Sequence, residues 1–193
     1  MSATAFAPRV EPTVENLLAA YHGEINARAR YLAFAKRADE DGFRGIASLF
    51  RAAARAEQIH AHNQARVLRQ MGAEAQAELI DCKVLDTVEN LKIAILGENF
   101  EIEEMYPEFV NQARATIHSN AARCFEWSLE AEKGHARLYA EALDLCLKNQ
   151  LESWIGAARD FFVCPVCACT SEQKTEDNCG ICQYPAERFE TIC

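Results

Sequence analysis

The chain has 193 residues, 50% of them hydrophobic, which is enough for one domain with a real core and a small appendage. Its formal net charge of −9 and the lack of a basic patch make nucleic acid a poor partner. The first dozen residues do not resemble a secretory signal, and no apolar stretch reaches the roughly 18 residues that span a bilayer. We therefore expect a cytoplasmic protein with no membrane partner.

An internal repeat organises most of the chain. The segment Thr13–Leu17 recurs letter for letter as Thr87–Leu91, at an offset of 74 residues, and the match continues further on at an offset of 75. Residues 13–72 and 87–148 therefore predict two copies of one helical hairpin.

Each copy is expected to form two helices, because Thr13 and Thr87 are suitable N-caps and Gly42 and Gly72 fall where helices should stop. The expected helices span residues 13–40, 43–71, 87–116 and 119–148. The link between the copies is long enough to cross the bundle. The fold class we predict is an all-α four-helix bundle, made of two helical hairpins joined by a crossover.

The change of offset has a structural consequence. One additional residue lies between Glu98 and Tyr106, inside what should be a continuous helix. A single inserted residue is accommodated best as a π-bulge, a feature that tends to mark functional sites. We therefore predict a π-bulge in the third helix.

A carboxylate interrupts the apolar stripe of every predicted helix at mid-height. Placing several carboxylates side by side away from water is costly unless a cation neutralises them. One Glu from each of two helices, with Glu-x-x-His from each of the other two, is the ligand set of di-iron and di-manganese bundles. The candidate ligands are Glu24, Glu98, Glu57 with His60, and Glu132 with His135.

The symmetry of these candidates supports the prediction, since a single Glu-x-x-His on a surface helix is usually a solvated pair. Glu101 breaks the symmetry because its counterpart is Ala27, and a seventh donor on one side suggests that one metal exchanges donors. Tyr31 and Tyr106 lie about two turns from the glutamates, where a phenol either hydrogen-bonds a carboxylate or is simply core. Iron, manganese and zinc all suit such donors. The other histidines are expected at the surface: His22, His62 and His118.

Six of the nine cysteines lie in the last thirty residues, and such clustering favours metal over disulfides. Two C-x-x-C knuckles there can close a tetrahedral site for zinc or for iron. The four candidate ligands are Cys164, Cys167, Cys179 and Cys182. Cys169 and Cys193 are extra, and we expect Cys169 to be a spare thiol. The remaining three are expected to act as small buried hydrophobes: Cys82, Cys124 and Cys146.

The composition changes abruptly near Val163. We predict a bundle domain over residues 1–148, a linker over 149–162 and a small four-cysteine domain over 163–193. The last of these is too short for a sufficient hydrophobic core, so it needs a metal to hold it together.

With these residues in place, the chain resembles the rubrerythrin family over essentially its whole length. The resemblance lies in Gly23-Glu24 with Tyr31, residues 56–61, residues 97–101 with 105–109, residues 131–136 and the paired knuckles. It implies a ferritin-like di-iron bundle with a rubredoxin-like domain that holds one iron on four cysteines. It also implies a hydrogen peroxide reductase of oxidative-stress defence.

The resemblance implies further roles, residue by residue. Glu57 and Glu132 would bridge the two irons, and His60 would exchange with Glu101 at one of them as the redox state changes. The implied di-iron ligands are Glu24, Glu57, Glu98, Glu101, Glu132 and His135. The family also implies an external electron-donating reductase. It further implies a head-to-tail homodimer, in which the four-cysteine iron of one subunit reduces the di-iron site of the other.

One position departs from the family. Ala168 stands where rubredoxin-like domains usually have Gly after the second cysteine, at a backbone angle that Ala resists. The local geometry and the redox potential of that site therefore stay open.

Two rival interpretations use the same residues. One is a ferroxidase or oxygen-reducing protein, which the motifs barely separate from a peroxide reductase. The other is an iron-binding or storage protein whose cysteine site is a structural zinc ribbon. Metal content separates them, because three irons per chain support electron transfer and zinc on the cysteines favours a structural role.

Overall fold

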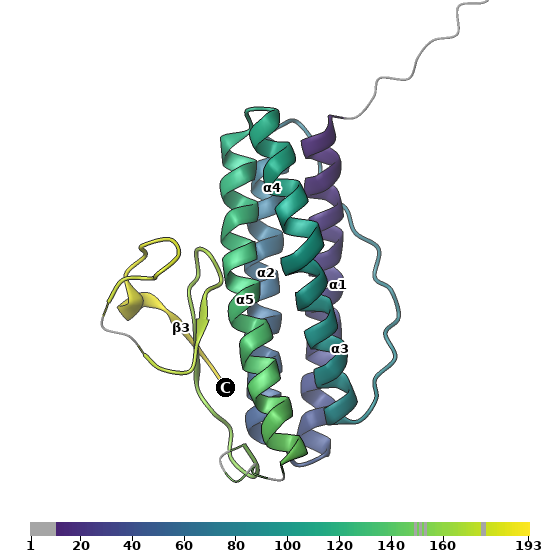
Figure 1. Cartoon of the computed structure of the whole chain (residues 1–193), viewed down its shortest axis with the longest axis vertical. Helices are drawn as coiled ribbons and strands as arrows, with labels where there is room; N and C mark the ends of the chain where they lie inside the picture. Colours follow the sequence, from purple (N-terminus) through teal and green to yellow (C-terminus); the bar gives the residue numbers. More distant parts are fainter. Residues whose placement is uncertain (1–10, 149, 151, 153, 175–176) are drawn as a thin grey trace, which may run out of the picture.

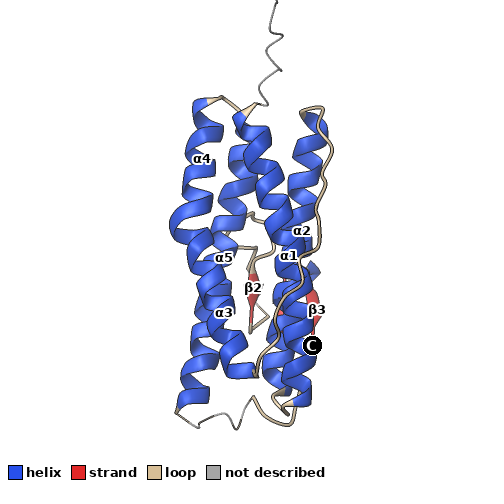
Figure 2. Ribbon diagram, turned by 90° about the vertical axis from the view of Figure 1, so that its right-hand side faces the viewer, coloured by secondary structure: helices blue, strands red, loops and turns tan. Residues whose placement is uncertain are grey.

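The computed structural model describes residues 11–148, 150, 152, 154–174 and 177–193. Its body is a helical bundle in which a π-helical segment, η1, joins α3 to α4 (Figure 1). The helices are α1 (Pro12–Glu40), α2 (Arg44–Gln70), α3 (Thr87–Phe100), η1 (Glu101–Met105), α4 (Tyr106–Ala115) and α5 (Ser119–Leu147). Figure 2 shows α3 and α4 as one continuous rod, so the bundle has the four predicted rods. The predicted π-bulge is confirmed.

The crossover between the hairpins is also confirmed. Gly42 and Gly72 adopt left-handed φ angles of +87° and +77° just beyond the ends of α1 and α2, as their positions predict. The chain after Gly72 runs the length of the bundle beside α1 (right-hand side of Figure 1). As a result α3 begins at the end of the bundle where α2 began. Within the described residues, no helix is long and apolar enough to cross a membrane.

The predicted N-caps are wrong. The carboxylates of Glu11 and Asp86, not the hydroxyls of Thr13 and Thr87, accept backbone N–H groups at the starts of α1 and α3. The Thr87 hydroxyl instead donates to Asp41 Oδ2 at 2.7 Å, which ties the start of α3 to the end of α1. The Thr13 hydroxyl lies 2.8 Å from the Thr116 hydroxyl, so in both helices another partner takes the Thr hydroxyl and an acidic residue one or two places earlier forms the cap.

A polar layer at mid-height divides the core. Along α1, Leu17 belongs to one buried apolar cluster and Phe34 to another, and Glu24 lies between them. The other rods repeat this order, so the packed apolar ends hold the polar layer away from water.

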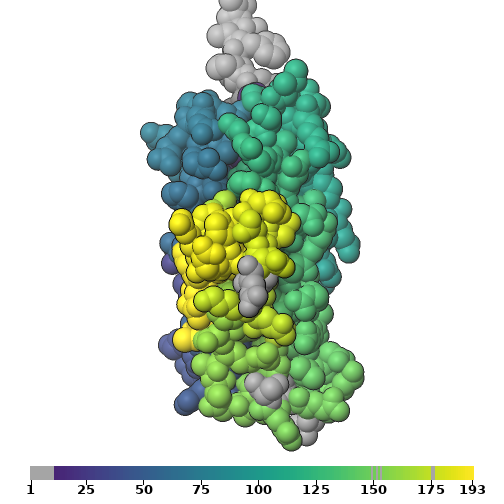
Figure 3. All heavy atoms as spheres, turned by 90° about the vertical axis from the view of Figure 1, so that its left-hand side faces the viewer, coloured from purple at the N-terminus to yellow at the C-terminus, as the bar shows by residue number. Residues whose placement is uncertain are grey.

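The described residues 154–174 and 177–193, here called the lobe, lie on the side of the bundle. Strands β1 (Phe161–Val163), β2 (Thr170–Ser171) and β3 (Glu190–Ile192) make an antiparallel sheet in the order β2-β1-β3, and η2 (Ala186–Arg188) is a short 3₁₀ turn. The strands contact α2 and α5. Figure 3 shows the lobe, in yellow, covering one face of the bundle near mid-height.

The lobe packs into the bundle rather than hanging from it. Trp154 and Phe161 are 1% and 0% exposed and belong to the same apolar cluster as Phe50 of α2. Arg55 of α2 donates two hydrogen bonds to the Glu190 carboxylate, at 2.6 and 2.7 Å. Within this chain the lobe and the bundle therefore share a core.

The predicted domain boundaries stay predictions. Positions 149, 151 and 153 of the predicted linker, and residues 1–10 of the predicted bundle domain, lie outside the described residues.

Candidate metal centres

Four glutamates and two histidines meet in the polar layer, each 0 or 1% exposed. They form two groups of four, and within each group one donor atom per residue lies within 4.8 Å of the others. The first group is Glu24, Glu57, His60 and Glu132, and the second is Glu57, Glu98, Glu132 and His135. The structure thus brings together six of the seven candidate bundle ligands.

Glu57 and Glu132 belong to both groups, so their carboxylates lie between two donor sets. Glu132 Oε1 is 2.8 Å from His60 Nδ1, and Glu132 Oε2 is 2.6 Å from His135 Nδ1. The i, i+3 spacing on α2 and α5 places each Glu and its His on one helix face. This geometry suits two cations held side by side with shared carboxylates.

The donor chemistry fits such a pair of cations. Glu24 Oε2 and Glu98 Oε2 are buried and find no hydrogen-bond partner in the described part of the chain. Buried carboxylate oxygens need a partner, and four carboxylates carry the charge that two divalent cations balance. Carboxylate and imidazole donors suit iron, manganese or zinc.

The pKa values of these groups are strongly shifted by burial and by one another. Burial raises the pKa of Glu57 and of Glu98, and repulsion from Glu132 adds to both. Burial would lower the pKa of His60, but Glu132 and Glu24 outweigh it and raise that pKa well above its usual value. Burial would also raise the pKa of Glu132, but the two imidazoles outweigh it and lower that pKa. Burial and mutual repulsion thus favour the protonated forms of Glu57, Glu98 and His60, which is the electrostatic strain that a bound cation would relieve.

Both predicted tyrosines hydrogen-bond carboxylates of the layer. Tyr31 Oη donates to Glu98 Oε1 at 2.7 Å, and Tyr106 Oη donates to Glu24 Oε1. Each phenol therefore reaches the glutamate of the other repeat copy. Of the two roles that the spacing left open, the structure shows carboxylate contact.

Two polar residues of the site were missed at the level of sequence. Gln64 Nε2 donates to Glu24 Oε1 at 3.0 Å and to Tyr106 Oη at 3.1 Å. Its position seven residues after Glu57, on the same helix face, is the signal that points to it. Thr170 of β2 lies 3.0 Å from His135 Nε2, and no periodicity signals that contact.

Glu101 is the candidate that the structure does not bring into either group. It is half-buried at the first position of η1. Burial raises its pKa, and Glu24 and Glu132 add to the shift. None of the three histidines expected at the surface belongs to a donor group: His22, His62 and His118.

The four knuckle cysteines form a second candidate site. Cys164 Sγ is 3.5 Å from Cys182 Sγ, and Cys167 Sγ is 3.4 Å from Cys179 Sγ. These separations are too long for disulfides, and they match thiolates around one tetrahedral ion. A hydrogen bond from Cys167 is the main cause that lowers the pKa of the Cys164 thiol to about 5. Cys169 lies outside the group, as expected of a spare thiol.

The two knuckles have the same backbone geometry. Ala168 and Gln183, which follow the second cysteine of each knuckle, adopt left-handed φ angles of +66° and +62°. Their N–H groups donate to Cys164 O and Cys179 O. Ala168 thus adopts a left-handed conformation, which usually favours Gly.

The isolated cysteines only partly behave as predicted. Cys124 is buried and Cys146 is half-buried, as a small hydrophobe would be. The expectation is wrong for Cys82, which is exposed in the crossover, where no helix face imposes burial.

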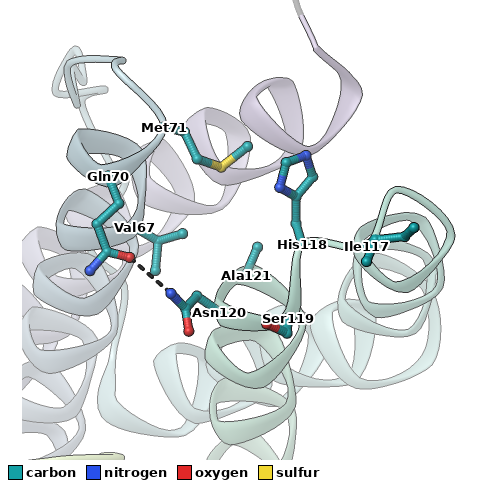
Figure 4. A pocket seen from close by; sticks show the side chains of 8 residues that line it. All are labelled: Val67, Gln70, Met71, Ile117, His118, Ser119, Asn120 and Ala121. Atoms are coloured by element: carbon teal, nitrogen blue, oxygen red, sulfur yellow. Dashed lines mark hydrogen bonds between the residues drawn. The ribbon is translucent and has the colours of Figure 1, made fainter.

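A pocket at one end of the bundle is separate from both candidate sites (Figure 4). It lies where α2 ends and α5 begins, and Asn120 Nδ2 donates there to Gln70 Oε1. Val67, which lines it, is seven residues beyond His60, or about two helical turns from the polar layer. None of its lining residues is a candidate ligand.

The fold and the two sites together define a class: ferritin-like carboxylate bundles for a metal pair, with an appended rubredoxin-like four-cysteine site. A family model described as rubrerythrin matches residues 15–143, and the chain belongs to the rubrerythrin family.

The relatives cover nearly the whole chain. It is similar to Rubrerythrin-2 of Clostridium acetobutylicum, with 34% identity over 93% of this chain and 96% of the relative. It is also similar to nigerythrin of Nitratidesulfovibrio vulgaris, with 33% identity over 93% and 86%. A fully reduced, all-ferrous nigerythrin structure matches with a TM-score of 0.83 and 31% identity, covering 99% of this chain and 91% of that one.

The family and the donor sets together support iron as the cofactor. They also support a di-iron oxidoreductase of oxidative-stress defence.

Proposed function

We propose that this protein reduces hydrogen peroxide to water at the bundle centre. The observation that supports this most directly is that Glu57 and Glu132 belong to both donor groups, as a pair of neighbouring metal ions would require. When bound, an iron pair supplies the two electrons that cleave the oxygen–oxygen bond, and two protons complete two water molecules.

The two donor groups and the family resemblance support the proposed ligand roles. Glu57 and Glu132 would serve both metal ions, and His60 and Glu101 would be alternative donors to one of them. Tyr31 and Tyr106 hold the terminal carboxylates by hydrogen bonds. The proposed bundle ligands are Glu24, Glu57, His60, Glu98, Glu101, Glu132 and His135. The proposed four-cysteine ligands are Cys164, Cys167, Cys179 and Cys182.

The four cysteines would hold an iron that supplies electrons one at a time to the bundle site, and an external reductase would provide them. Contact between the lobe and His135 supports this role over a purely structural zinc ribbon. We also propose that the protein forms a homodimer and works in the cytoplasm.

Peroxide and dioxygen kinetics test the reaction. The reduced iron-loaded protein is mixed anaerobically with hydrogen peroxide or with dioxygen in a stopped-flow instrument. We expect faster oxidation by peroxide, and loss of turnover in Glu98→Ala. Faster oxidation by dioxygen, or full peroxide turnover in that variant, would show that the proposal is wrong. Zinc in the four-cysteine site of protein purified from cells would remove the proposed electron relay.

A mixed dimer distinguishes electron transfer between the two subunits from electron transfer within one chain. Chains carrying Cys167→Ser, which lack a complete cysteine site, are combined with Glu132→Ala chains, which lack a complete bundle site. Head-to-tail transfer restores turnover in the mixed dimer, whereas transfer within one chain leaves it inactive.

A further inference from the structure

Thr170 connects the C-terminal lobe to the bundle centre. It lies in β2, is 6% exposed, and its Oγ1 is 3.0 Å from His135 Nε2. The same hydroxyl donates to the carbonyl oxygen of Ala168 at 3.0 Å. Ala168 directly follows Cys167, so this short chain of hydrogen bonds starts beside a thiol of the four-cysteine site.

The direction of these hydrogen bonds is determined by the groups involved. A carbonyl oxygen only accepts, so the single hydroxyl proton of Thr170 points to Ala168. The Thr170 oxygen is then left to accept, and His135 Nε2 must carry the hydrogen that it receives. In a neutral imidazole the other nitrogen is then bare.

The bare nitrogen faces the metal donors. His135 Nδ1 lies 2.6 Å from Glu132 Oε2 and 4.0 Å from Glu57 Oε1, both members of the same donor group. We infer that Thr170 is a positioning residue, which fixes the tautomer and ring orientation of His135 so that Nδ1 is presented to the metal. A ligand histidine usually relies on such a partner for its outer nitrogen.

His60, the equivalent histidine in the other repeat copy, has no such support. Its Nε2 is buried, and no described residue hydrogen-bonds it. The lobe therefore makes the two imidazoles different: His135 is held at Nε2 from outside the bundle, and the described residues give Nε2 of His60 no such contact. The inference uses only the ligand role of His135 within the proposed function, not the reaction with peroxide.

The lobe presents Thr170 from a position fixed at several other points. Arg55 holds Glu190 of β3, and Asn63 Nδ2 donates to Val166 O at 2.8 Å. These anchors do not involve the Thr170 hydroxyl. A variant at Arg55 therefore removes one docking contact and leaves the Asn63 contact, the shared apolar cluster and the Thr170 hydroxyl in place.

The test compares Thr170→Val, which is nearly isosteric and lacks the hydroxyl, with Thr170→Ser, which keeps it. Full-length protein is loaded with zinc as a diamagnetic probe, and the imidazole nitrogens are observed in long-range ¹H–¹⁵N NMR spectra. We expect His135 to carry its hydrogen on Nε2 in the parent protein and in the Ser variant. We expect Thr170→Val to shift the His135 signals and to weaken zinc binding at one of the two bundle positions by about tenfold.

Two matched controls accompany the test. Ser171→Ala removes the neighbouring hydroxyl, which hydrogen-bonds Gln173 in its own loop, and Arg55→Met removes one contact between the lobe and α2. Both should leave the His135 signals unchanged. The inference is overturned if Thr170→Val keeps the parent signals and affinity, if Thr170→Ser behaves like Thr170→Val, or if Arg55→Met reproduces the loss. Because the measurement uses no peroxide, its outcome is independent of whether the protein is a peroxidase.

Discussion

The two halves of the bundle centre contain the same donors but are supported differently. The first half contains Glu24 and His60, and the second contains Glu98 and His135, at matching positions of the internal repeat. In both halves a tyrosine from the opposite copy hydrogen-bonds the glutamate. The repeat thus accounts for what the halves have in common.

The differences lie where the repeat is not preserved. Gln64 supports the first half, whereas its counterpart Tyr139 has a hydroxyl with no partner among the described residues. Thr170 supports His135 of the second half, whereas Nε2 of His60 is unsupported. The glutamate is thus better held in one half and the histidine in the other. A duplicated ligand set therefore need not give two equivalent metal positions.

The largest expected effect is loss of iron when a glutamate that belongs to both donor groups is replaced, compared with a glutamate that belongs to one. Replacing Glu57 or Glu132 with Ala should lose both bundle irons, because each belongs to both donor groups. Replacing Glu24 or Glu98 should lose mainly one. Elemental analysis, with the four-cysteine iron as an internal reference, measures this, and peroxide turnover should fall at least about 100-fold in the first pair. Equal iron loss in all four variants would contradict the division into halves.

The next effect concerns pH in the metal-free protein. The pKa values of Glu57 and Glu98 are raised by burial, and that of His60 by Glu132 and Glu24, which outweigh burial. The folded state then holds protons that the unfolded state releases, so the stability contributed by these three groups is present below their ordinary pKa values and is lost as pH rises through the raised ones. The expected loss is about 1.4 kcal/mol per pH unit for each proton difference.

Urea unfolding followed by helical circular dichroism between about pH 5 and pH 9 tests this prediction. Metal-loaded protein is the control and should show the opposite trend, because metal binding needs deprotonated ligands. Parallel pH profiles with and without metal would argue against it.

A smaller effect compares the counterparts Gln64 and Tyr139. Gln64→Leu removes the donor to Glu24 and Tyr106, and should cost about 1–3 kcal/mol and weaken metal binding in the first half about tenfold. Tyr139→Phe removes a hydroxyl without a partner in the described chain, and should change stability by less than about 0.5 kcal/mol. Denaturant unfolding and metal titration measure both. Similar losses in the two variants would mean that the halves are supported alike.

The smallest expected effect is a change in stability of the lobe when the left-handed residue of either cysteine knuckle is replaced by Gly. Gln183 is exposed and has a left-handed φ angle, so Gln183→Gly removes the steric strain of its side chain. It should stabilise the lobe by about 1 kcal/mol. Ala168→Gly relieves the same strain but loses a buried methyl group worth about 0.8 kcal/mol, so its net effect should be close to zero. Loss of the iron–thiolate absorbance in denaturant reports both. A larger gain at Ala168 would contradict this account.

Much of the fold followed from local features of the sequence. The internal repeat, with glycines at its expected helix ends, predicted the helices, and the one-residue mismatch between repeat copies predicted the π-helical segment. The N-cap at α3 was wrong because the Thr87 hydroxyl donates to Asp41, just beyond the end of α1, which leaves Asp86 to accept the backbone N–H group. Gln64 was overlooked because a glutamine at that spacing becomes distinctive only once it is buried.

The sequence by itself determined which donors face one interior, because the helical period fixes their faces and buried carboxylates need cations. Only the tertiary structure decided which phenol meets which carboxylate and that Thr170 reaches His135. Those contacts join residues 67, 82 and 35 positions apart. They depend on how rods and lobe pack in space, which the periodicity of a single helix does not encode.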